Sequence, residues 1–296
     1  MSKTTTAKST INLAFAADEK YFQPMSVAMV SILKNSGKHD NLCFYIICNS
    51  VSDKLKNELL GIKKIKDCEI KFIDINQEKL SYFLKDTHCH ITLTAYCRLF
   101  LPSLLPDLDK ILYLDCDIIA KKNIRRLYNT DISKCYVGAV IDIGCVCWYR
   151  YLENCPYDFL NIMNTGVLLM NLKMWREDNL TQKAIELGKA GCGEAQHDQE
   201  IINILCHDKC LFLDMSWNVQ DSFFRNAGEV KSNPFRYYIR RCAHYPKIIH
   251  YTTQFKPWND IHIAHAFDWW YYNSFSPLRR KFPLNQILPV RKKQNV

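Results

Sequence analysis

The chain has 296 residues and a net charge of +9, with 48% of its residues hydrophobic and 23% charged. These fractions are typical of a folded globular protein and exclude a mainly disordered, collagen-like or coiled-coil chain. The length fits one large α/β domain or two smaller domains, and such a chain can bury a large core without disulfides.

The first part of the chain alternates strand-like and helix-like segments. Apolar runs rich in β-branched and aromatic residues predict strands at 11–17, 42–48 and 69–75. Between them, a helix is predicted from Pro24 to Lys34 and another after Ser52 or Asp53, either of which can cap it. This order, with nearly continuous apolar strands, predicts a mostly parallel sheet covered by helices.

The rest of the chain continues the pattern. Helices are predicted at 92–101, 172–188 and 197–205, and strands at 110–114, 136–142, 167–172, 211–214 and 247–251. Near Pro257 the composition becomes more aromatic and more basic. We therefore expect a main α/β domain over residues 1–257 and a small helical extension, basic and aromatic, over residues 258–296.

The sequence predicts a cytoplasmic protein with reduced cysteines. Asp18, Glu19 and Lys20 interrupt any signal-peptide-like apolar run, and no apolar run approaches the roughly 18 residues of a membrane-spanning helix. The fourteen cysteines are scattered, many of them in apolar runs. The closest pairs, Cys145 with Cys147 and Cys206 with Cys210, lack the spacing of a zinc module, so we expect no structural zinc.

Two aspartates, Asp115 and Asp117, directly follow the apolar strand at 110–114. In open α/β sheets ligands bind beyond the carboxyl ends of the strands, and two carboxylates two residues apart can turn toward one divalent cation such as Mg²⁺ or Mn²⁺. The pair could instead simply stabilise a turn, since short motifs of this kind are common.

A histidine near the end of the chain strengthens the metal interpretation. His250 ends the apolar run KIIHY, and an imidazole is an acceptable third ligand beside two carboxylates. Lys256, six residues further on, could reach a phosphate held by the same cation. Taken singly, each of these residues is more often an ordinary surface side chain.

Taken together, the motifs of the chain resemble those of the bacterial retaining glycosyltransferases of family eight. The resemblance covers roughly residues 11–260 and rests on segments that occur in the family's order. They are AADEKY at 16–21, AYCRL at 95–99, YLDCD at 113–117, NTGVLLMNL at 164–172, HDQ at 197–199, and HYTT at 250–253 with KPW at 256–258.

The resemblance implies a GT-A fold with a Rossmann-like central sheet and transfer with retention of anomeric configuration. It implies a UDP-sugar donor, UDP-galactose or UDP-glucose, and Mn²⁺ or Mg²⁺ as cofactor. The metal ligands would be Asp115, Asp117 and His250. Residues implied at the donor site are Ala16, Ala17, Asp18, Tyr21, Arg98, Asp115, Cys116, Asn164, Thr253 and Lys256. Thr253 stands where the family often has glycine, and Met163 where it usually has an aromatic residue.

Retention usually requires a nucleophile on the far face of the sugar. The candidates for catalytic residues are Asp198, Gln199 and Asp142. Gln199 is a poor nucleophile and is better suited to positioning the sugar, and Asp198 could simply cap a helix. We therefore favour attack by the acceptor hydroxyl on the front face, with the donor phosphate as base.

The C-terminal segment predicts contact with a membrane. Of the net charge of +9, +5 lies in the last 36 residues, and six aromatic residues fall within 267–275. Aromatic rings and cations favour the surface of an anionic leaflet, so we expect peripheral binding to the inner face of the cytoplasmic membrane, beside a lipid-linked glycan acceptor such as lipopolysaccharide core.

The sequence argues against several other functions. A nucleotide-dependent oxidoreductase would carry a glycine-rich turn after the first strand, where this chain has Asp18, Glu19 and Lys20. A nucleic-acid-binding protein would spread its basic residues over an aromatic face, so no nucleic acid partner is expected. A protein or another glycolipid stays open as the acceptor. A catalytically silent relative is disfavoured, since all three metal ligands are present.

Overall fold

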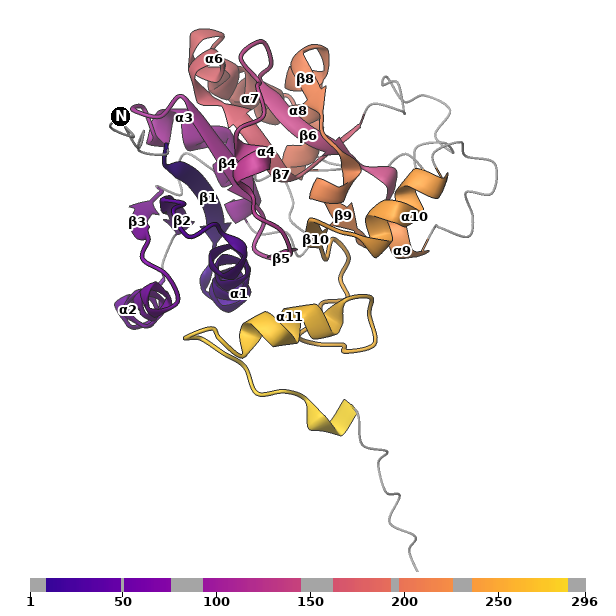
Figure 1. Ribbon diagram of the computed structural model, residues 1–296. Coiled ribbons are helices and arrows are strands. Elements are labelled where there is room, and N and C mark those ends of the chain that lie inside the picture. The colour runs from indigo at the N-terminus through magenta and orange to yellow at the C-terminus, as the bar shows by residue number, and fades with distance from the viewer. Residues whose placement is uncertain are drawn as a thin grey trace, which may run out of the picture.

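The computed structural model describes residues 9–48, 51–75, 93–144, 162–192, 197–225 and 236–286. Its centre is a seven-stranded sheet in the order β3-β2-β1-β4-β7-β6-β8 (Figure 1). The strands are β1 (Ile11–Ala17), β2 (Leu42–Cys48), β3 (Glu69–Asp74), β4 (Lys110–Leu114), β6 (Val137–Ile141), β7 (Met163–Asn171) and β8 (Cys210–Phe212). A second, three-stranded sheet joins β5 (Ile118–Ala120), β10 (Ile248–His250) and β9 (Val219–Gln220) in that order.

The predicted mostly parallel sheet is confirmed, with one strand in the opposite direction. The pairs of β1 with β2 and β4, of β2 with β3, and of β6 with β8 are parallel. By contrast, β7 runs antiparallel to both of its neighbours, β4 and β6. The start of β7 therefore lies beside the end of β4.

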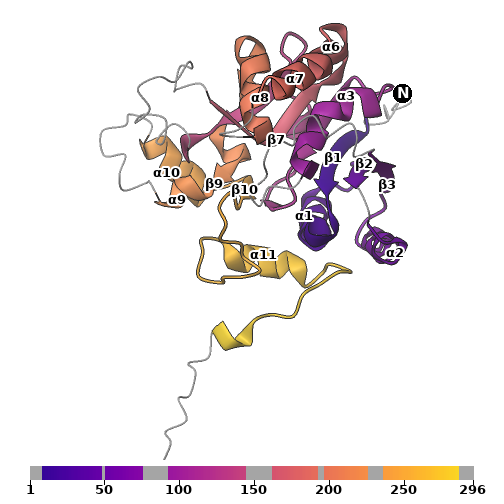
Figure 2. The ribbon, with the colours of Figure 1, turned by 180° about the vertical axis from the view of Figure 1, so that it is seen from behind.

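Helices cover both faces of this sheet, as Figures 1 and 2 show from opposite sides. Residues Ile11, Leu13, Phe15 and Ala17 of β1 belong to one apolar core, and Ala14 and Ala16 to the other, because successive side chains of a strand point to opposite faces. The helices are α1 (Glu19–Asn35), α2 (Asp53–Leu59), α3 (Leu101–Leu104), α4 (Arg125–Tyr128), α6 (Leu172–Glu177), α7 (Leu180–Lys189), α8 (His197–Cys206), α9 (Asp221–Arg225), α10 (Arg236–His244) and α11 (Ala266–Asn273).

Short 3₁₀ helices connect several of these elements. They are η1 (Leu60–Lys64), η3 (Leu93–Phe100), η5 (His207–Lys209), η6 (Met215–Trp217) and η7 (Leu284–Gln286). The helix predicted over 92–101 is thus present in the tighter 3₁₀ form, followed by one turn of α-helix.

One predicted helix start is wrong, and one predicted helix is interrupted. The first helix begins at Glu19, five residues before Pro24, because the side chain of Asp18 accepts a hydrogen bond from the Tyr21 amide and caps it. The helix predicted over 172–188 is divided into α6 and α7. Asn179 adopts a left-handed conformation at the break, with φ of 53°, which asparagine tolerates better than most residues.

The C-terminal helix α11 lies against α1 (Figure 1). Trp269, Trp270 and Tyr272 are buried in the same core as α1 and β1, and the Trp270 indole donates a hydrogen bond to the Pro257 carbonyl at 2.9 Å. Some of the aromatic residues predicted to contact a membrane are therefore part of the hydrophobic core instead.

The sequence also predicts that no helix spans a membrane and that the cysteines are reduced. None of the helices in the described part of the chain combines the length and the apolar character that crossing a bilayer requires. The described cysteines are free and mostly buried. Cys145 and Cys147 lie outside the described residues.

Candidate active site

Strand pairing brings three distant segments to one edge of the central sheet. Because β7 is antiparallel to β4, the Asp115 amide donates to the Gly166 carbonyl at 2.8 Å, at the start of β7. Because β10 pairs with β5, His250 lies opposite Ile118, directly after the second aspartate. The polar residues that follow β4, open β7 and end β10 therefore face one another.

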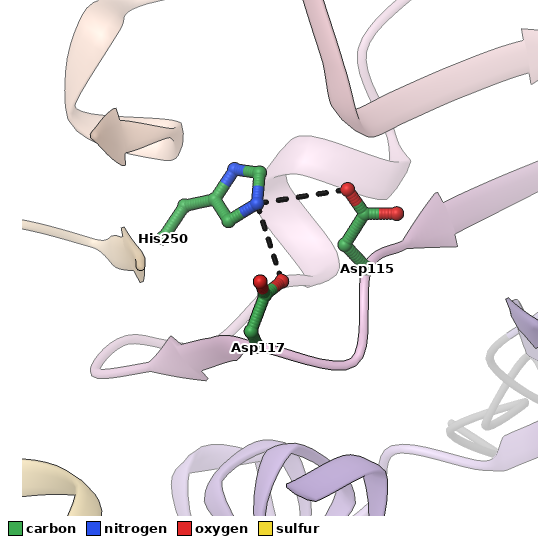
Figure 3. Close-up of side chains that lie close together, drawn as sticks. All are labelled: Asp115, Asp117 and His250. Carbon is green, nitrogen blue, oxygen red and sulfur yellow. Dashed lines mark ion pairs between the residues drawn. The ribbon is translucent and has the colours of Figure 1, made fainter. Parts of the chain in front are cut away.

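Asp115, Asp117 and His250 form a cluster of three potential metal ligands, as predicted (Figure 3). The His250 Nε2 atom lies 3.3 Å from Asp117 Oδ1 and 3.6 Å from Asp115 Oδ2. One ligand atom from each residue lies within 4.8 Å of the others. Two carboxylates and one imidazole on one side of a cavity suit a divalent cation such as Mn²⁺ or Mg²⁺, which would keep further positions for a diphosphate.

Gly166 makes this close grouping possible. A Cβ atom at this position would lie 2.0 Å from His250 Cε1 and 2.6 Å from Asp115 Oδ2. Both distances are far below van der Waals contact, so any side chain here would push the imidazole and the carboxylate out of place.

Lys256 supplies a cation next to the cluster. Its Nζ atom lies 2.7 Å from Asp117 Oδ2 and also donates to the Tyr251 carbonyl. Burial alone would raise the pKa of Asp117, but Lys256 and His250 outweigh it and hold that pKa well below its usual range. Likewise, burial would lower the pKa of Lys256, but Asp117 outweighs it and the pKa is raised. Asp117 and Lys256 are therefore both charged.

Arg98 forms ion pairs with two carboxylates of the site. Its guanidinium is 2.8 Å from Asp115 Oδ1 and 3.0 Å from Asp198 Oδ2, and it stacks on the Tyr113 ring at 4.3 Å. Burial would lower its pKa, but the two aspartates raise it, so Arg98 stays charged. Burial in turn raises the pKa of Asp198 to about 6, although Arg98 acts against that rise.

Two side-chain amides and a carboxylate form another part of the cavity wall. Asn164 Nδ2 and Gln199 Nε2 both donate to Asp142 Oδ2, at 3.0 and 3.1 Å. Backbone amides of β7 hold the two side chains, since the Thr165 amide donates to Gln199 Oε1 and the Gly166 amide donates to Asn164 Oδ1.

Two side chains line the end of the site nearest to β1. The Cys116 thiol donates to the Ala16 carbonyl at 3.1 Å, and burial raises its pKa well above the usual range, so it stays protonated. The Tyr21 and Trp258 rings lie nearly perpendicular to each other, with centroids 6.2 Å apart.

A single cavity of about 510 Å³ brings most of the predicted residues together. Its lining includes Ala16, Tyr21, Arg98, Asp115, Cys116, Asp117, Asp142, Asn164, Asp198, Gln199, His250 and Lys256. Three predicted residues do not line it. Ala17 is buried, Asp18 caps α1, and the Thr253 amide donates to Asp221 Oδ2 at 2.9 Å.

Several residues of the site were not among the predicted site residues. Thr94, Ala95, Tyr113, Thr165, Gly166, His197 and Thr252 also line the cavity. Most of them neighbour predicted residues within the same sequence motifs, which is the signal that could have identified them. Asn218 is different: it is completely buried beside His250, and no motif marks it.

Structural comparison identifies the fold. A crystal structure of the galactosyltransferase LgtC, in complex with donor and acceptor sugar analogues, superimposes with a TM-score of 0.74 over 93% of this chain and 98% of LgtC, at 23% identity. The central sheet and its flanking helices are those of a GT-A glycosyltransferase.

The chain belongs to glycosyl transferase family 8, whose sequence model matches residues 12–262. It is 28% identical to a lipopolysaccharide 1,2-glucosyltransferase of Escherichia coli, over 84% of this chain and 73% of the relative. It is 29% identical to the glycosyltransferase GlyA of Streptococcus pneumoniae over 88% of this chain, which spans only 34% of GlyA.

Proposed function

We propose that the protein is a metal-dependent, retaining hexosyltransferase that moves galactose or glucose from a UDP-sugar to a hydroxyl of a glycan. The observation that carries this proposal is the cluster of Asp115, Asp117 and His250 in the wall of a cavity that also holds Lys256. A nucleoside diphosphate is the kind of leaving group that needs a cation and a lysine side by side.

Different residues of the cavity would bind the diphosphate and the nucleoside of the donor. A bound Mn²⁺ or Mg²⁺ would neutralise charge that grows on the diphosphate as the glycosidic bond breaks. Lys256 donates to the same phosphates once its ion pair with Asp117 is broken. The ion pair with Arg98 holds Asp115 in place. Tyr21, which lines the same cavity, stacks on the uracil. Asp18, which follows β1 and caps α1 through Oδ1, would accept from the ribose or the base through its other oxygen.

The contacts of the candidate nucleophiles support front-face transfer. Asp198 is buried against Arg98, and one oxygen of Asp142 accepts from both Asn164 and Gln199. These side chains position the sugar and stabilise positive charge at its anomeric carbon. The acceptor hydroxyl then attacks on the face that the diphosphate leaves, and a phosphate oxygen takes its proton.

The relatives suggest the substrates. One acts on lipopolysaccharide, as its name states, and LgtC transfers galactose. We propose a lipid-linked acceptor of the lipopolysaccharide core type, reached from the cytoplasmic side, where UDP-sugars are made.

A panel of UDP-hexoses tests the reaction. We expect slow hydrolysis of either UDP-galactose or UDP-glucose in the presence of Mn²⁺, and none in EDTA, because water can replace the acceptor once the donor is bound. Product UDP is measured by a coupled assay, and the preferred donor is then used to screen glycan acceptors. Hydrolysis of neither donor, or full turnover in EDTA, would contradict the proposed function.

The exposed side of α11 supports the membrane contact. Phe267 and Tyr271 are 61% and 55% exposed, and Phe275 is exposed one turn beyond. Arg279, Arg280 and Lys281 follow at once, while Arg291, Lys292 and Lys293 lie outside the described residues. We propose that residues 258–296 hold the enzyme on the anionic inner face of the cytoplasmic membrane without spanning it.

Liposome sedimentation tests this contact. Vesicles with anionic lipid should carry the full chain into the pellet at low salt, and Phe267→Ser with Tyr271→Ser should shift most of it to the supernatant. A version that ends near Pro277 should behave similarly, because the basic residues are removed. The matched control is Tyr237→Ser with Tyr245→Ser, which removes two exposed rings on or beside α10. If the full chain stays in the supernatant, the membrane contact is wrong.

A further inference from the structure

We infer that Asn218 is a positioning residue that orients the metal ligand His250 and links it to the side chains facing the donor sugar. The inference rests on the proposed function and deepens it. Asn218 lies between η6 and β9 and has no exposed surface. Its side chain contacts His250 Nδ1 at 3.0 Å through Oδ1 and donates to Asn164 Oδ1 at 2.8 Å through Nδ2.

The directions of these hydrogen bonds follow from one backbone amide. The Gly166 N–H can only donate, and it lies 3.1 Å from Asn164, so the Asn164 oxygen faces Gly166. The Asn164 nitrogen then faces the Asp142 carboxylate at 3.0 Å, which accepts. Asn218 must turn its own nitrogen toward the Asn164 oxygen, and its oxygen is left for His250.

The orientation of His250 follows in turn. Because the Asn218 oxygen is an acceptor, His250 carries a proton on Nδ1 and donates it. In the neutral ring, Nε2, which faces Asp115 and Asp117, then carries the lone pair that a cation can accept. The tautomer that can bind a metal is thus selected by an amide that does not line the cavity.

The same network reaches the sugar side of the cavity. Asp142 Oδ2 accepts from Asn164 and also from Gln199, which is itself held by the Thr165 amide. A continuous series of hydrogen bonds therefore runs from His250 through Asn218 and Asn164 to Asp142. Loss of Asn218 should disturb metal binding at one end and sugar binding at the other.

Two substitutions separate these effects. Asn218→Leu keeps the branched shape and removes both hydrogen bonds, so Mn²⁺ affinity should fall roughly 10- to 100-fold, the range found when outer ligand partners are removed. Asn218→Asp keeps an acceptor for His250 and loses the donor to Asn164. It should bind Mn²⁺ as tightly as the original protein or more tightly, but bind the UDP-hexose less well while its affinity for UDP with Mn²⁺ is unchanged.

The measurements are Mn²⁺ titration followed by electron paramagnetic resonance, without nucleotide, and calorimetry with UDP and with the UDP-hexose. Melting temperatures check folding. If Asn218→Leu does not fold, Asn218→Asp alone decides: equal losses of Mn²⁺, UDP and UDP-hexose affinity would mean a merely structural role and overturn the inference. Unchanged Mn²⁺ affinity in a folded Asn218→Leu would overturn it too, with the proposed function intact. If the original protein binds no Mn²⁺, the inference and the proposed function both fail.

Discussion

Asp117→Asn should weaken Mn²⁺ binding strongly and lower turnover by roughly 10²- to 10³-fold, the range for removing one electrostatic partner of a transition state. The substitution keeps the size of the side chain and removes the charge that faces His250 and Lys256. The protein should stay folded, because an asparagine oxygen can still accept from Lys256. Mn²⁺ titration, initial rates with the preferred UDP-hexose and a melting curve measure the three quantities.

The matched control for this variant is Asp107→Asn, at an exposed position that does not line the cavity. It should leave Mn²⁺ affinity and turnover unchanged. If Asp117→Asn also binds Mn²⁺ normally, the cluster is not the metal site, whatever happens to the rate.

Gly166→Ala should lower Mn²⁺ affinity and turnover by about 100-fold or more. The added methyl group would lie 2.0 Å from His250 and 2.6 Å from Asp115, so at least one ligand must move. A displacement of about 1 Å can cost ~10²-fold in rate, and overpacking costs about 1–3 kcal/mol of stability. We expect a measurable but modest drop in melting temperature together with the large functional loss.

Gly138→Ala is the control for this substitution. Gly138 lies in β6 of the same sheet, and its added Cβ would meet Ile132 and Leu213 at an ordinary 3.4 Å. This variant should retain Mn²⁺ binding and turnover. Equal Mn²⁺ affinities for the two variants would show that close approach at Gly166 does not organise the ligands.

Local sequence patterns predicted much of the fold. The strands at 11–17, 42–48 and 110–114 match β1, β2 and β4, because buried strands require continuous apolar side chains. The predicted start of the first helix at Pro24 is wrong, because the Asp18 cap starts the helix at Glu19 and the proline is tolerated inside α1.

The direction of β7 could not be predicted in this way. Its apolar run is equally compatible with either direction, since the hydrogen bonds of a strand do not depend on its side chains. Only the antiparallel pairing with β4 places Asn164 and Gly166 beside Asp115. In a parallel arrangement the start of β7 would lie at the opposite edge of the sheet.

Tertiary packing also decides which aromatic rings of α11 are buried and which are exposed. The sequence places Trp269, Trp270 and Tyr271 side by side, and all three are amphipathic. Packing against α1 and the Pro257 carbonyl buries the two tryptophans, while Tyr271 faces outward. Which rings remain for a membrane depends on the angle at which α11 meets the core.

By itself, the sequence determined which residues are available for the proposed chemistry: two carboxylates after a strand, a histidine and a lysine near the end, and the family motifs around them. These features depend on residue identity and local spacing, which a sequence states directly. The tertiary structure alone decided that Gly166 must lack a side chain and that Asn218 lies behind His250. Both depend on how closely separate strands approach, and that distance is set by the packing of the whole sheet.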